Sequence, residues 1–220
     1  MTDPRAKARE LAAQAVQDGD PTRWFEELYA LAARGDATVP WADLEPNPVL
    51  RRVLPALAVD GARTLVVGCG YGDDAVLLAA EGARVTAFDV ASTAVARCRQ
   101  RFPEASVDWC VADALAPPAA WTQAFDLVVE INTLQVLPPP ERARAGQALG
   151  TCVAPGGALL VIARGREPAD PAGAMPWPLT VAEVEALAVD GLVLERLDDL
   201  LDAENPPVRR IVAVLRRSGR

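Results

Sequence analysis

Two kinds of apolar spacing divide the chain. Between residues 4 and 35 the apolar positions recur at helical intervals and predict two helices, the second capped by Asp20 with Pro21 at its first position. The proline-rich link that follows (TVPWADLEPNP, residues 38–48) cannot be regular helix, and a short helix is expected at residues 49–57.

Beyond residue 60 short β-branched runs alternate with helical segments bounded by glycine or proline. The expected strands are residues 64–67, 84–90, 106–113, 125–132, 156–164, 192–197 and 208–217, and the expected helices are residues 73–82, 91–102, 140–153 and 180–188. This alternation is typical of right-handed βαβ units. We therefore expect an α/β fold: a Rossmann-like, seven-stranded, mostly parallel sheet with helices on both faces and one antiparallel strand near the C-terminus, at residues 208–217.

The composition restricts the partners and the compartment. The 220 residues fit one domain, which we divide into an N-terminal helical lid or cap (residues 1–60) and a Rossmann-like core (residues 61–220). The net charge of −8 argues against nucleic acid, and no apolar run is long enough to span a membrane. Four cysteines without metal-ligand spacing favour a cytoplasmic protein with free thiols, and the lack of histidine argues against a metal site. We expect either a monomer or a homodimer.

A glycine cluster follows the first strand of the alternating region. The stretch TLVVGCGYGDD (residues 64–74) places three glycines in five positions, which suits a tight turn or a close approach of backbone to a ligand. Asp89 and Asp113 end the next two strands, at the sheet edge where ligands of such folds bind. Asp89 can accept both hydrogens of a ribose diol and Asp113 can meet an adenine edge, so we expect an adenosine-based ligand.

The residues after the glycines distinguish between adenosine ligands. A dinucleotide-binding loop has a glycine where this chain has Asp73, which Asp74 follows. Two carboxylates at the start of a helix would repel a diphosphate, whereas they are compatible with a ligand that carries an ammonium and a sulfonium. This favours S-adenosylmethionine, with S-adenosylhomocysteine as its product, over NAD.

Four stretches in order, VVGCGYGDDAVLLAAEG, VTAFDVASTAV, ADAL and FDLVVEINTLQVLPP, resemble the class I S-adenosylmethionine-dependent methyltransferases. VPWADLEPNPVL, Asp74 and LPPPER are most similar to the thiopurine and thiol (halide) methyltransferase branch. The resemblance implies methyl transfer to a small molecule, on sulfur or nitrogen. It also implies these cofactor contacts: Trp41, Gly68, Cys69, Gly70, Asp89, Val90, Asp113, Ala114, Glu130 and Ile131.

The acceptor pocket is expected from aromatic and polar residues near this edge of the sheet, namely Trp24, Tyr29, Asn132 and Trp177. Methyl transfer requires no catalytic side chain, and Glu130 is the candidate base, although a contact with the ammonium of the cofactor is favoured for it. The thiopurine-type enzymes carry arginine and the plant thiol-type enzymes tyrosine at the position of Ile131, so the resemblance does not identify the acceptor. Two alternatives stay open: an NAD(P)-dependent oxidoreductase and a non-catalytic S-adenosylmethionine-binding module.

Overall fold

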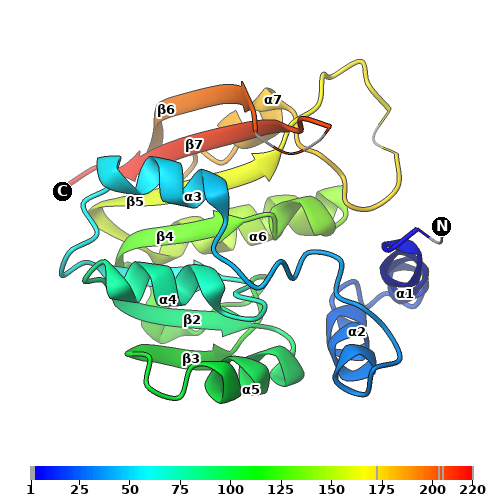
Figure 1. Cartoon of the computed structure of the whole chain (residues 1–220). Coiled ribbons are helices and arrows are strands. Elements are labelled where there is room, and N and C mark those ends of the chain that lie inside the picture. The colour runs from blue at the N-terminus through cyan, green and yellow to red at the C-terminus, as the bar shows by residue number, and fades with distance from the viewer. Residues whose placement is uncertain (1–2, 172, 203, 205, 220) are drawn as a thin grey trace.

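The computed structural model describes residues 3–171, 173–202, 204 and 206–219 (Figure 1). The strands are β1 (Arg63–Val67), β2 (Arg84–Asp89), β3 (Val107–Val111), β4 (Phe125–Ile131), β5 (Val153–Arg164), β6 (Leu192–Leu201) and β7 (Arg209–Arg217). The α-helices are α1 (Ala6–Gln17), α2 (Arg23–Ala33), α3 (Pro48–Val53), α4 (Asp73–Ala80), α5 (Ser92–Arg101), α6 (Pro139–Cys152) and α7 (Val181–Glu185), with 3-10 turns η1 (Leu54–Ala56), η2 (Ala119–Trp121) and η3 (Leu134–Val136).

The seven strands form one sheet in the order β3-β2-β1-β4-β5-β7-β6. β7 is antiparallel to both of its neighbours, β5 and β6, and the pairs among β1 to β5 are parallel. The predicted fold class, including the single antiparallel strand, is confirmed. β6 is longer than predicted, because Asp198 and Asp199 stay in register with β7 although their polarity suggested an end to the strand.

Both faces of the sheet are buried, which explains why its inner strands are apolar without alternation. Leu65 and Val67 of β1 pack in one cluster with residues of α6 and α7, whereas Val66 between them packs in a second cluster with residues of α3, α4 and α5. This sandwich leaves only the ends of the strands free for a ligand.

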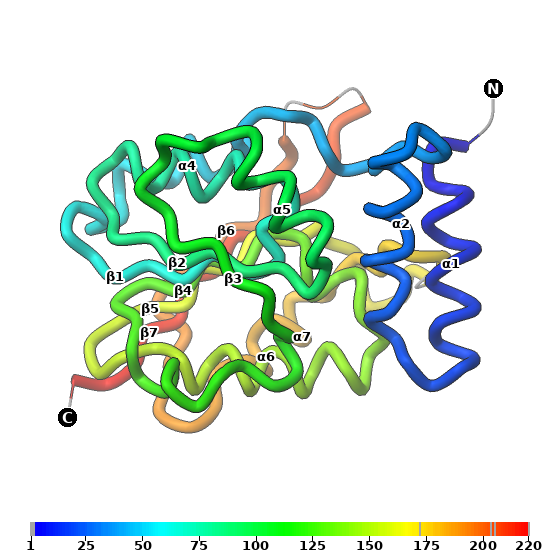
Figure 2. Tube along the Cα trace, turned by 90° about the horizontal axis from the view of Figure 1, so that it is seen from below, coloured from blue at the N-terminus to red at the C-terminus, as the bar shows by residue number. Residues whose placement is uncertain are grey.

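Helices α1 and α2 lie together beyond the carboxyl ends of the strands, away from the sheet faces (Figures 1 and 2). A carboxylate oxygen of Glu26 in α2 accepts a hydrogen bond from the backbone N–H of Thr93 in α5, at 3.0 Å. α2 begins at Arg23 and not at Pro21 as predicted, because Pro21 and Thr22 form a turn; Asp20 still accepts from the Arg23 N–H at 3.2 Å. No helix within the described residues is long and apolar enough to cross a bilayer.

Candidate functional site

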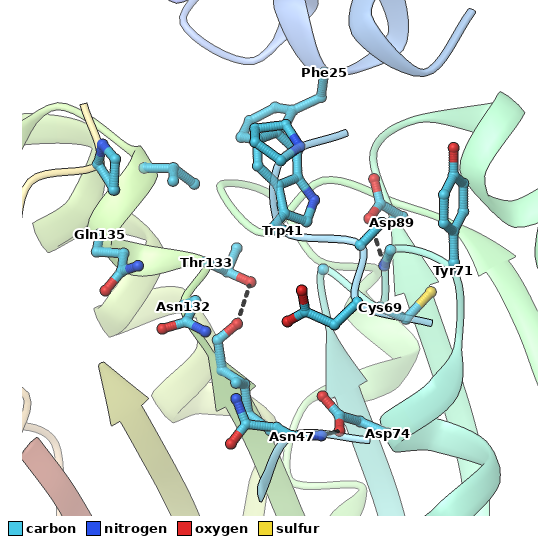
Figure 3. Close-up of a pocket in the computed structure, with 18 of the residues that line it drawn as sticks. Phe25, Trp41, Asn47, Cys69, Tyr71, Asp74, Asp89, Asn132, Thr133 and Gln135 are labelled. Atoms are coloured by element: carbon cyan, nitrogen blue, oxygen red, sulfur yellow. Dashed lines mark hydrogen bonds between the residues drawn. The ribbon is translucent and has the colours of Figure 1, made fainter. Parts of the chain in front are cut away.

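A cavity of about 570 Å³ lies at the carboxyl ends of the strands. Its walls are the loops that follow β1 to β4, the ends of β5 and β7, one side of α2 and the link at residues 40–48. Figure 3 shows Cys69, Tyr71 and Asp89 on one side of it and Asn132, Thr133 and Gln135 on the other. Most of the residues singled out from the sequence line this cavity: Tyr29, Trp41, Gly68, Cys69, Gly70, Asp89, Val90, Asp113, Ala114, Ile131 and Asn132.

The glycine loop combines a turn with close packing. Gly68 and Gly72 have φ angles of 56° and 91°, which residues with a side chain rarely adopt. A Cβ atom at Gly68 would lie 2.4 Å from the Oγ1 atom of Thr133, and one at Gly72 would lie 2.6 Å from the ring of Trp109. Glycine is therefore required at both positions for two reasons, the positive φ angle and the lack of space for a Cβ atom. Without side chains here, the backbone of the loop is exposed to the cavity.

Asp89 connects two loops of the cavity wall. Its side chain is 5% exposed, and its two oxygens accept hydrogen bonds from the backbone N–H groups of Gly70 and Ala91, at 3.0 and 2.9 Å. Burial raises the pKa of Asp89 to about 6. A carboxylate held in this way keeps a fixed direction at the end of β2.

The two carboxylates after the glycine loop have different partners. Asp73 is paired with Arg101 through two hydrogen bonds of 2.6 and 2.8 Å, so its charge is already balanced. Asp74 instead accepts from the backbone N–H of Asn47 at 2.7 Å, and burial raises its pKa to about 6. Asp74 thus ties the proline-rich link to the glycine loop, and it lines the cavity.

The carboxylate of Glu130 is held by the loop that follows β4. Its side chain is fully buried, outside the cavity wall, and its Oε1 atom accepts from the backbone N–H groups of Thr133 and Leu134, at 2.6 and 2.9 Å. Burial raises its pKa to about 7. The Oε1 atom of Glu130 therefore caps the turn η3, whereas its buried Oε2 atom has no hydrogen-bond partner among the described residues.

The aromatic residues separate into one that covers the cavity and others that support it. Trp41, 36% exposed, lies over the cavity (Figure 3), and its Nε1–H donates to the hydroxyl of Tyr29 at 3.1 Å. Trp24 is only 1% exposed and packs edge-on against Trp41 from the interior, with ring centres 5.8 Å apart. Trp24 was expected to contact the acceptor, but it does not line the cavity. It supports Trp41 instead.

Trp177 also lies outside the cavity wall. It packs against the cluster formed by α1 and α2, and its backbone N–H donates to the carbonyl of Gln135 at 2.7 Å. Its neighbours Met175 and Pro176 line the cavity in its place. Part of this segment therefore lines the cavity, although Trp177 itself does not.

Sequence reasoning missed the residues at the β5 and β7 end of the cavity. Arg164 ends β5, and its backbone N–H donates to the side-chain oxygen of Gln135 at 2.7 Å. Arg210 on β7 is buried and donates to Asn132 Oδ1 at 3.3 Å. Arg164 could have been predicted from the sequence, because it directly follows the apolar run ALLVIA. Asp89 was identified by the same pattern, a polar residue at the end of an apolar strand.

Comparisons with known proteins agree with this geometry. A family model described as a methyltransferase domain matches residues 65–157. The probable thiol methyltransferase 2 of Arabidopsis thaliana is 28% identical over 156 residues, which are 68% of this chain and 66% of that protein. The ubiquinone biosynthesis O-methyltransferase of Xanthomonas campestris pv. campestris (strain B100) is 36% identical over 150 residues, which are 66% of this chain and 62% of that protein.

The likeness extends to solved structures. One, from work on the conversion of a disulfide bond into a thioacetal group during echinomycin biosynthesis, superposes with a TM-score of 0.74 at 21% identity, over 89% of this chain and 94% of that one. At this identity the match establishes a shared fold. The matches to the two curated relatives span just under two thirds of their lengths.

Proposed function

Since the chain belongs to the class I S-adenosylmethionine-dependent methyltransferases, we propose that its cavity binds S-adenosylmethionine and that the protein transfers the methyl group to a small molecule, on sulfur before nitrogen. The observation that carries the proposal is the convergence of the glycine loop, Asp89 and Asp113 on one cavity, at the ends of β1, β2 and β3. This is the position where folds of this type bind adenosine ligands.

The proposed contacts follow the order of the strands. The bare backbone of Gly68, Cys69 and Gly70 faces the methionine part of the cofactor. The ribose diol donates to the carboxylate of Asp89, whose backbone hydrogen bonds keep it aimed at the end of β2. Val90 packs on the adenine.

Asp113 and Ala114 frame the far edge of the adenine. The side chain of Asp113 accepts from the backbone N–H of Leu115 at 2.8 Å, which orders this loop. Trp41 closes over the cofactor as part of a lid formed by residues 1–60, with its indole oriented by Tyr29. Ile131 lies next to the reacting methyl.

The bound cofactor supplies an activated methyl group on a sulfonium, so the chain has to align the acceptor and exclude water. In the part of the chain that the structure describes, Glu130 lies outside the cavity wall, Glu204 is paired with Arg210, and the two arginines cannot accept a proton, so we assign no general base to the acceptor side. The acceptor must then ionise by itself, and a thiol, with a pKa of about 8.5, does so near neutral pH.

The test combines binding with product formation. Calorimetry should show binding of S-adenosylmethionine and S-adenosylhomocysteine but not of NAD(P), and a panel of thiols, amines and phenols should give methylated thiols at the highest rate. NAD(P) binding without S-adenosylmethionine binding would overturn the proposal. Cofactor binding without product from any acceptor would favour the non-catalytic module, and preference for phenols would remove the sulfur assignment.

A further inference from the structure

The cavity is electrostatically divided. Asp74 and Asp89 lie on the side of β1 and β2, and Asn132 and Gln135 lie across the cavity from them (Figure 3). Arg164 bonds to Gln135 through its backbone N–H and Arg210 bonds to Asn132 through its guanidinium, so both arginines lie at this other side. A cofactor with a sulfonium, an ammonium and one carboxylate has a net positive charge, which suits the acidic side. The basic side is then left for the acceptor.

Arg210 is fully engaged within the protein. Its guanidinium donates to Asp202 at 2.6 Å, to Glu204, and to Asn132 at 3.3 Å. The Asn132 backbone has a φ angle of 62°, and this contact holds its amide at the end of β4. Arg210 is therefore occupied by contacts within the protein, and it positions Asn132 in the cavity wall.

Arg164 is not engaged in the same way. Its side chain is 24% exposed, and its guanidinium donates no hydrogen bond to any residue in the described ranges. Arg164 forms a long ion pair with Glu204, 3.6 Å from its Oε2 atom, and the Oε1 atom of the same carboxylate accepts a hydrogen bond from Arg210. Burial, together with the neighbouring charges of Arg210 and Arg5, lowers the pKa of Arg164, and the carboxylates of Glu204 and Asp202 compensate its charge only in part.

The third arginine increases the excess of positive charge. Arg5, which precedes α1, lines the same cavity, and within the described part of the chain its side chain makes no ion pair. Arg164 and Arg210 share two carboxylates, those of Asp202 and Glu204, and Arg5 adds a third cation to this end of the cavity. One positive charge remains unbalanced in a chain whose net charge is −8.

We propose that this basic end recognises a carboxylate on the methyl acceptor, with Arg164 as its principal hydrogen-bond donor and Arg5 as a second cation. The inference rests on the proposed function for the direction of the cofactor. A planar carboxylate matches the fork of a guanidinium, and its single charge matches the single unbalanced cation, whereas a phosphate would bring a second charge. The acceptor is accordingly a small thiol acid, with its sulfur toward Ile131 and its carboxylate toward the end of β5.

The test compares two thiols that differ in one group, para-mercaptobenzoate and the neutral para-mercaptobenzamide. Calorimetry measures the binding of each to the complex with S-adenosylhomocysteine, so no turnover is needed. The carboxylate should bind more tightly by roughly ten- to a hundredfold, as expected for a hydrogen-bonded charge pair. Arg164→Gln should abolish that preference, and Arg5→Gln should reduce it.

Arg196→Gln is the matched control, because it removes one arginine from an exposed ion pair with Asp198 on β6, outside the cavity wall. It should leave the preference unchanged. Affinity for S-adenosylhomocysteine should be the same in all variants, which shows that each is folded. Equal binding of the two thiols to the unaltered protein, or a preference that survives Arg164→Gln, would overturn the inference.

The two proposals can fail separately. If the para-mercaptobenzoate complex forms in an Arg164-dependent way but no methylated product appears, the basic end is an anion site and methyl transfer to sulfur is wrong. If thiols are methylated at rates independent of their carboxylate and of Arg164, methyl transfer stands and the carboxylate site is wrong.

Discussion

The carboxylate of Asp89 accepts a hydrogen bond from the backbone N–H of Gly70 at 3.0 Å, so the ends of β1 and β2 are joined across the floor of the cavity. Asp89 is the last residue of β2 and Gly70 lies in the loop after β1, and these two strands are paired in register from Arg63 with Arg84 to Val67 with Phe88. The contact therefore depends on the sheet, and it orders the glycine loop through the residue proposed to hold the ribose.

Asp89→Asn tests whether this carboxylate binds the ribose of the cofactor. The affinity for S-adenosylmethionine should fall roughly tenfold or more, because the ribose diol loses a charged acceptor. Binding to the unaltered protein should also weaken below about pH 6, where Asp89 becomes protonated. Calorimetry across pH checks both, and an unchanged affinity in Asp89→Asn would exclude the ribose contact.

Glu130→Gln should leave methyl transfer intact, because Glu130 caps η3 outside the cavity wall. Its folded-state pKa of about 7 lies above the unfolded value, so the folded protein binds the extra proton and stability falls as pH rises through about 4 to 7. Glu130→Gln should flatten this part of the profile of melting temperature against pH. A collapse in rate with unchanged cofactor affinity would instead identify Glu130 as a base.

Two tryptophans in edge-on contact should behave oppositely. Trp24→Ala should cost about 3–5 kcal/mol of unfolding free energy, because it empties a fully buried site. Trp41→Ala should change the melting temperature little but speed the release of the cofactor, since the indole is partly exposed over the cavity. Denaturant unfolding and stopped-flow dissociation measure the two effects, and a lid role for Trp41 is wrong if the release rate is unaffected.

Gly68→Ala should both destabilise the protein and weaken cofactor binding, because the new Cβ meets Thr133 Oγ1 in addition to the unfavourable φ angle. Gly19→Ala is the control: it has a φ angle of 77° but no atom within 4 Å of the added Cβ. It should cost only about 1 kcal/mol from strain. Adding Thr133→Ala to Gly68→Ala should recover the part due to the clash, and no recovery would mean that strain alone governs Gly68.

The sequence by itself determined the order of the elements and the side of the sheet on which the site lies. Local periodicity predicts each strand, and a residue at a strand end, such as Asp89 or Asp113, reaches the cavity whatever the distant packing. The glycine loop was predictable for the same reason, because its φ angles are a local property of the chain.

Only the tertiary structure decided how the charged side chains are used. Asp73 is balanced by Arg101 from the next helix along the chain, and Glu130 turns back onto its own loop; neither partnership follows from spacing. The pairing of β5 with β7 brings Arg164 and Arg210 to one end of the cavity, although they are far apart in the sequence. Charges interact through space over a few ångströms, so their partners are set by the folded sheet and not by the order of residues.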